Sequence, residues 1–171
     1  MSGCKFSGKV DAVYNPPRNW VLNKPLSFEC DQLSDDDIAM LKKCDVKVTK
    51  TGKVTVPAGY VTDLASVPRA CWALIAPWDV ARSAIIHDNC YEKINTKYKS
   101  VQAKASGSGP QDKSDRELYR AIADKLFLCG MQNSEPSVPG WKIWSAYYAV
   151  RMFGRWAING SGPRYLSGSG K

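Results

Sequence analysis

The period of the hydrophobic pattern changes along this chain, and the change sets the fold class. Before residue 57 apolar and polar residues alternate, most clearly over residues 45–56, and such alternation is typical of strands with one buried face. After residue 69 apolar residues recur at intervals of three and four, as in amphipathic helices. The sequence therefore predicts an α+β fold, with a small antiparallel β region in the N-terminal third followed by three main helices.

Local signals place the first elements. Strands are predicted over residues 8–14 and 20–28, the second interrupted at 23–25, and a hairpin over residues 45–56. Gly52 fits the left-handed position of the hairpin loop. Between the strands, residues 34–43 predict a short helix, because Ser34 can accept hydrogen bonds from first-turn amides and three aspartates suit the positive end of the helix dipole.

The later segments are predicted to be helical, with two flexible stretches. Helices are expected at residues 78–93, 115–131 and 138–157, and a short turn at 72–75. Residues 97–114 are rich in Lys, Ser and Gly, which predicts a flexible surface loop. We interpret the chain as a single domain, residues 1–171, made of a β-rich part (6–57), a connector (57–69), a helical part (70–158) and a flexible tail (159–171).

Composition limits the partners. With 171 residues and 44% apolar content the chain can build one real core. It lacks an apolar run long enough to span a membrane and the apolar stretch of a secretory signal, so we expect no transmembrane segment. A net charge of +8 would favour anionic surfaces, but we interpret it first as an ordinary solvated basic surface. Without a phosphate-cradling loop or a nucleic-acid module, no specific nucleic-acid partner is expected.

The six cysteines leave two alternatives open. None lies in a Cys-x-x-Cys pair, and a single histidine cannot complete a zinc site, so a structural zinc is not expected. The cysteines are then either scattered free thiols or include some disulfide.

One cluster carries candidate chemistry. His87 is the single histidine, and Tyr91 shares its helix face four residues later. Asp124 is the one acid in the apolar stretch 121–130, and a carboxylate there needs a partner. We predict that Asp124 fixes the tautomer of His87, which leaves the other ring nitrogen free to take a proton from water. Asp88 is placed to ligate a cation, with Asp63 from the connector.

Two interpretations of this cluster remain open. Its residues form either a reactive site or a satisfied internal network that pins the connector to the helices. Ser66 lacks the glycines of a nucleophile elbow, and we interpret it as a cap or turn residue. The aromatic residues of 141–156 indicate a core or a protein interface rather than a nucleic-acid platform.

Four ordered motifs, at residues 56–69, 84–91, 122–127 and 149–154, carry a resemblance across nearly the whole chain. In these motifs the chain resembles a family of small proteins of unassigned function that tailed bacteriophages and prophages encode. The resemblance implies a phage origin. We interpret the chain as a virion or tail-associated component, made in the host cytoplasm and located in the virion, that docks on other virion proteins through its aromatic C-terminal helix and flexible tail.

A second resemblance covers two helices. The segment His87-Asp88-Asn89-Cys90-Tyr91 resembles the active-site helix of phospholipase A2. This resemblance implies that His87 activates water, that Asp88 binds calcium and that Asp124 orients the histidine. The implied activity is metal-assisted ester hydrolysis in lipid or cell envelope.

The chain departs from the phospholipase pattern in its cysteines and its calcium loop. Ser83 and Ala84 stand where that family has paired cysteines, and its calcium-binding glycine loop is absent. Calcium would therefore need Asp88, Asp63, backbone carbonyls and waters. If the two helices run antiparallel with His87 facing Asp124, a disulfide between Cys90 and Cys129 is disfavoured.

Overall fold

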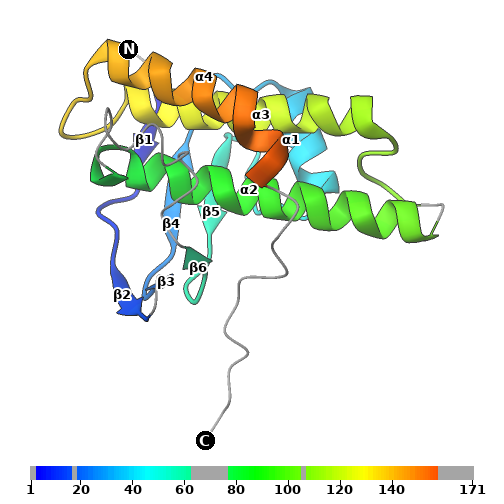
Figure 1. Cartoon of the computed structure of the whole chain (residues 1–171), viewed down its shortest axis with the longest axis horizontal. Coiled ribbons are helices and arrows are strands. Elements are labelled where there is room, and N and C mark those ends of the chain that lie inside the picture. The colour runs from blue at the N-terminus through cyan, green and yellow to red at the C-terminus, as the bar shows by residue number, and fades with distance from the viewer. Residues whose placement is uncertain (1–2, 17–18, 63–76, 105–106, 158–171) are drawn as a thin grey trace, which may run out of the picture.

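The fold was analysed in a computed structural model that describes residues 3–16, 19–62, 77–104 and 107–157. The strands precede the three long helices, with one short helix among them, which confirms the predicted α+β class (Figure 1). The three long helices are α2 (Pro77–Lys104), α3 (Lys113–Gln132) and α4 (Gly140–Ala157). Helix α3 packs against both α2 and α4, so it is the central helix of this layer.

Two three-stranded antiparallel sheets precede the long helices. One has the order β1-β4-β5 and the other the order β2-β3-β6. The strands are β1 (Lys5–Phe6), β2 (Ala12–Asn15), β3 (Asn19–Leu22), β4 (Leu26–Glu29), β5 (Lys53–Val56) and β6 (Val61–Thr62). The β1-β4-β5 sheet faces the long helices, because β4 and β5 both contact α2. The main core lies there, and its fully buried members include Phe28, Leu41, Val54, Ile85 and Leu126.

The strand predictions were right in kind and partly wrong in extent. Of the strand predicted over residues 8–14, only the end is extended structure, because β2 begins at Ala12; β1 lies before the predicted range, and Gly8 with its positive φ stands between the two strands. The predicted break at 23–25 is present, and it sends β3 and β4 into different sheets. The connector predicted to be irregular over residues 57–69 contains one short strand, β6, in which Val61 pairs with Val21 of β3, and residues 63–69 lie outside the described residues.

The predicted hairpin is present, but its second arm has another main partner. Thr49 N donates to Lys53 O at 3.0 Å, and Gly52 has φ +75°, so the loop has the expected left-handed glycine. β5 nevertheless forms its continuous ladder with β4, and the first arm joins it through a single bridge, between Val48 and Val54. The buried apolar face of β4 explains this choice, since pairing with it covers Val54 and Val56.

Helix α1 (Asp35–Lys43) confirms the capping prediction. The Ser34 side chain accepts a hydrogen bond from Asp37 N at 3.1 Å, and the Asp37 carboxylate accepts one from Ser34 N at 3.1 Å. This reciprocal pair satisfies two amides that a helix start leaves unpaired.

Helix α2 is longer than predicted. It continues to Lys104, so residues 97–104 are helical and the predicted flexible loop was wrong there. Ile94 and Val101, seven residues apart, are buried on one face, and this packing extends the helix despite the polar composition. The predicted turn at 72–75 and the predicted tail at 159–171 lie outside the described residues.

None of the helices described is both long and apolar enough to cross a lipid bilayer.

Candidate functional site

Helices α2 and α3 bring His87 and Asp124 into direct contact. The Nε2 atom of His87 lies 2.8 Å from Oδ1 of Asp124, and both side chains are buried. His87 occupies the face of α2 that packs on α3, the helix with which α2 makes its most extensive contact. The pairing therefore follows from the packing of the two helices.

The Asp124 carboxylate is hydrogen-bonded to three side chains. Tyr91 donates its hydroxyl to Oδ1 at 2.5 Å, and Arg151 of α4 donates to Oδ2 at 2.8 Å. Together with His87, these donors satisfy both carboxylate oxygens of a fully buried acid. Such a carboxylate is fixed in position, so it can fix the imidazole in turn.

Sequence reasoning missed the two arginines of this cluster. Arg120 is 1% exposed and donates to the Tyr91 hydroxyl at 3.3 Å and to Glu117 at 2.7 Å. Arg120 precedes Asp124 by one turn of α3, so an arginine in a buried helical face was an available signal. Arg151 had no comparable signal, because its contact depends on how α4 crosses α3.

The two sides of the imidazole differ. The rings of Tyr91 and Phe127 lie 4.0 and 5.1 Å from the His87 ring, centroid to centroid. The Nδ1 atom lies 3.7 Å from Oδ1 of Asp88, beyond hydrogen-bonding range. Among the residues that the structure describes, neither Nδ1 nor Oδ2 of Asp88 has a hydrogen-bond partner. Buried polar atoms are usually satisfied, so these two atoms are exceptions within the cluster.

The charges around His87 favour its protonated form. Burial by itself lowers the pKa of His87, but the hydrogen bond to Asp124 and the nearby Asp88 carboxylate outweigh it and raise the pKa above the ordinary value of 6.5. Burial likewise opposes ionisation of Asp124, yet its bonds to His87, Arg151 and Tyr91 hold its pKa below the usual range. Burial and the Asp124 charge raise the pKa of Tyr91, so its hydroxyl stays protonated and donates.

The described residues do not fit a calcium ion by themselves. No group of three or more His, Cys, Asp or Glu side chains that could hold a metal occurs within the described ranges. Asp88 offers at most two of the six or more oxygens that calcium requires. Asp63, the second expected ligand, lies outside the described residues, as does Ser66.

Helix α4 has one buried face and one exposed face. Ile143, Ala146 and Val150 are buried in a cluster with residues of α2 and α3. The opposite face exposes large apolar side chains, at exposures between 45% and 64%: Trp141, Trp144, Tyr148 and Met152. The core interpretation is therefore wrong for the aromatic residues Trp141, Trp144 and Tyr148, and the interface interpretation stays a prediction for them.

The family described as "Protein of unknown function (DUF1353)" matches residues 38–150. Since the match covers more than half of the 171 residues, the chain belongs to this family. The matched segment begins within α1 and ends within α4, so it contains His87, Tyr91 and Asp124. No curated protein and no solved structure matched the chain.

Proposed function

We propose that this family member is a phage-encoded hydrolase in which His87 is the general base that activates water for attack on an ester. The observation that carries the proposal is the asymmetry of the ring. Nε2 is bonded to Asp124 at 2.8 Å, whereas Nδ1 is buried without a hydrogen-bond partner among the described residues. A purely structural network would be expected to satisfy both nitrogens.

The chemistry follows from this arrangement. Nε2–H of His87 donates a hydrogen bond to Asp124, which fixes the neutral tautomer with its lone pair on Nδ1. A water bound between Nδ1 and Asp88 would pass one proton to Nδ1 as its oxygen attacks the ester carbonyl. Asp124 then stabilises the imidazolium, which returns the proton to the departing alkoxide. Tyr91 and Arg151 are positioning residues, because they act on Asp124.

The proposed substrate class is an ester of lipid or cell envelope. Its support is the resemblance of the His87–Tyr91 segment to phospholipase A2, together with the position of Tyr91 and Asp124 around the ring. Calcium is proposed only as an added cation, and no step above depends on it.

The test is hydrolysis of a fluorogenic lipid ester by the wild type and by His87→Gln. Each is assayed with added calcium and with a chelator. General-base catalysis contributes about 10²- to 10⁴-fold, so we expect a loss in that range with the cooperative unfolding transition retained. Asp88→Asn is the companion variant, because it keeps His87 as the base and removes only the carboxylate beside the proposed water. No turnover by the wild type in either condition, or equal turnover by His87→Gln, would exclude the proposal.

A second candidate function, a virion or tail component, is favoured by the exposed face of α4. A contiguous group of exposed aromatic residues is typical of protein interaction sites. The proposed partners are other virion proteins, and the proposed location is the particle. Mass spectrometry of purified particles should detect the chain, and Trp144→Ser should lower its incorporation while Leu118→Ser, an exposed change on α3, should not. Particles without the chain would end this candidate.

A further inference from the structure

Cys4 and Cys30 lie directly opposite each other across two antiparallel strands. The β1–β4 register pairs Lys5 with Glu29 and Phe6 with Phe28, and one further step along the same register pairs Cys4 with Cys30. Their sulfur atoms are 3.7 Å apart. Two thiols 26 positions apart in the sequence are therefore neighbours on one face of a sheet.

The hydrogen-bond pattern makes this position suitable for a disulfide. Ser7 N donates to Ser27 O, so the pair 7 and 27 is hydrogen-bonded, and alternation along the ladder makes 4 and 30 a non-hydrogen-bonded pair. In agreement, Cys30 N donates to Gly52 O on the other side of β4. Non-hydrogen-bonded pairs have Cα atoms about 4.5 Å apart, which falls within the range that disulfides span.

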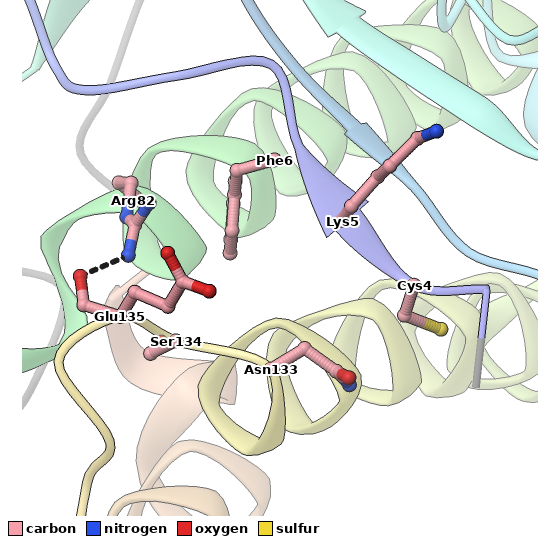
Figure 2. A pocket seen from close by; sticks show the side chains of 7 residues that line it. All are labelled: Cys4, Lys5, Phe6, Arg82, Asn133, Ser134 and Glu135. Carbon is pink, nitrogen blue, oxygen red and sulfur yellow. Dashed lines mark hydrogen bonds between the residues drawn. The ribbon is translucent and has the colours of Figure 1, made fainter. Parts of the chain in front are cut away.

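One of the two thiols borders a surface pocket. Figure 2 shows the pocket, which has a volume of about 270 Å³ and is lined by Cys4, Lys5, Phe6, Arg82, Asn133, Ser134 and Glu135. Cys30 is 1% exposed and does not line it. A small oxidant that enters the pocket would therefore meet Cys4 first, and Cys30 would act second.

We propose that Cys4 and Cys30 form a disulfide by exchange with a low-molecular-weight disulfide such as oxidised glutathione. The Cys4 thiol loses its proton, and its sulfur attacks one glutathione sulfur, which forms a mixed disulfide and releases one glutathione thiolate. The Cys30 thiol then loses its proton, and its sulfur attacks the Cys4 sulfur and releases the second glutathione. Two protein thiols are oxidised and one glutathione disulfide is reduced to two thiols.

The bond would fix the edge strand of the sheet. β1 is two residues long, and its Phe6 ring packs on Phe28 at 4.5 Å and under the Arg82 guanidinium at 4.7 Å. Arg82 also donates to the carbonyl oxygen of Glu135 at 2.5 Å (Figure 2). A covalent link beside Phe6 would hold the N-terminal strand against the start of α2. This inference is independent of the proposed hydrolase activity.

Cys129 is the competing partner. A hydrogen bond from the Cys30 thiol lowers the pKa of Cys129, so a bond between these two is the alternative product. Cys129 also donates to Gln32 at 3.1 Å. It lies on α3, whereas Cys4 directly precedes β1 and continues the register that faces Cys30, so the sheet geometry favours Cys4.

The experiment exposes the native protein to oxidised glutathione, blocks the remaining thiols under denaturing conditions and maps the peptides by mass spectrometry. We expect a Cys4–Cys30 cross-link, blocked cysteines reduced from six to four, and a thermal midpoint raised by roughly 5–10 °C. Cys4→Ser and Cys30→Ser should lack both effects, and Cys129→Ser should keep them. A main product that joins any other pair, a persistent glutathione adduct on Cys4, or six unreacted thiols would overturn the proposal.

Discussion

The Nε2 atom of His87 and the Oδ1 atom of Asp124 lie 2.8 Å apart, although the residues are 37 positions apart in the sequence. Asp124 also binds Arg151 from a third helix, so one carboxylate links α2, α3 and α4. The candidate site and the packing of the helical layer therefore depend on the same buried charge.

Asp124→Asn should be strongly destabilising, because it leaves the Arg151 and His87 groups without their carboxylate. Breaking a buried ion pair by removing one partner costs about 3–5 kcal/mol, and we expect a loss of free energy of unfolding of that order in urea titrations. Asp45→Asn is the matched control, since Asp45 pairs with Lys97 at 3.1 Å on the surface and such pairs contribute about 0–1 kcal/mol. If Asp124→Asn and Asp45→Asn lost equal free energy of unfolding, the buried charge of Asp124 would not be needed for stability.

The stability of the wild type should fall with rising pH in a window set by His87. Its folded pKa is raised above 6.5, so folding favours the protonated ring. That contribution is complete below about pH 6.5 and is lost as pH rises through the folded pKa. We expect urea titrations to show this loss in the wild type and not in His87→Gln. If the free energy of unfolding changed with pH in the same way in both proteins, this expectation would be wrong.

Arg151→Gln should move the pH dependence of hydrolysis to higher pH. The guanidinium lies 2.8 Å from Asp124, and without its charge the carboxylate stabilises the imidazolium more strongly. In the proposed mechanism the neutral ring is the base, so activity would then rise at a higher pH. The shift should be below about one unit, since Arg151 is partly exposed. Arg151→Lys keeps the charge and should shift less. A shift to lower pH would exclude this role.

Tyr91→Phe should cost about 1–3 kcal/mol in free energy of unfolding, because it removes a hydroxyl that donates to a buried carboxylate at 2.5 Å and accepts from Arg120. Tyr148→Phe makes the same chemical change on a side chain that is 58% exposed, and its effect should stay within about 0.5 kcal/mol. Chemical denaturation of both variants measures the difference. Similar values for both would mean that the Tyr91 hydroxyl is energetically unimportant.

Gly52→Ala should destabilise the β4–β5 region by at least about 2 kcal/mol. Gly52 has φ +75°, and a Cβ atom there would lie 2.3 Å from the carbonyl oxygen of Cys30. Gly140→Ala is the control at the start of α4, where a Cβ atom meets nothing within 4 Å. Thermal unfolding should show a lower midpoint for the first variant and an unchanged or higher one for the second. A neutral Gly52→Ala would contradict the left-handed loop.

The sequence by itself determined the features that depend only on residues a few positions apart in the chain. The alternation around Val54, the Ser34 cap and the left-handed Gly52 are all local, because strand, cap and turn geometry couple residues only a few positions apart. His87 and Tyr91 share a helix face for the same reason, four residues apart on α2.

The contact of His87 with Asp124 was predicted, because a carboxylate in an apolar helical stretch needs a partner, but the tertiary structure alone decided which other distant groups meet. Three features depend on how the helices and strands pack together. Helix α2 extends to Lys104, Arg151 contacts Asp124, and Cys4 lies opposite Cys30. Burial of an apolar side chain can make a segment of polar composition helical, as the burial of Val101 does near the end of α2. Sequence periodicity identifies the face that a residue occupies, but the crossing of helices and the register of strands determine what that face contacts.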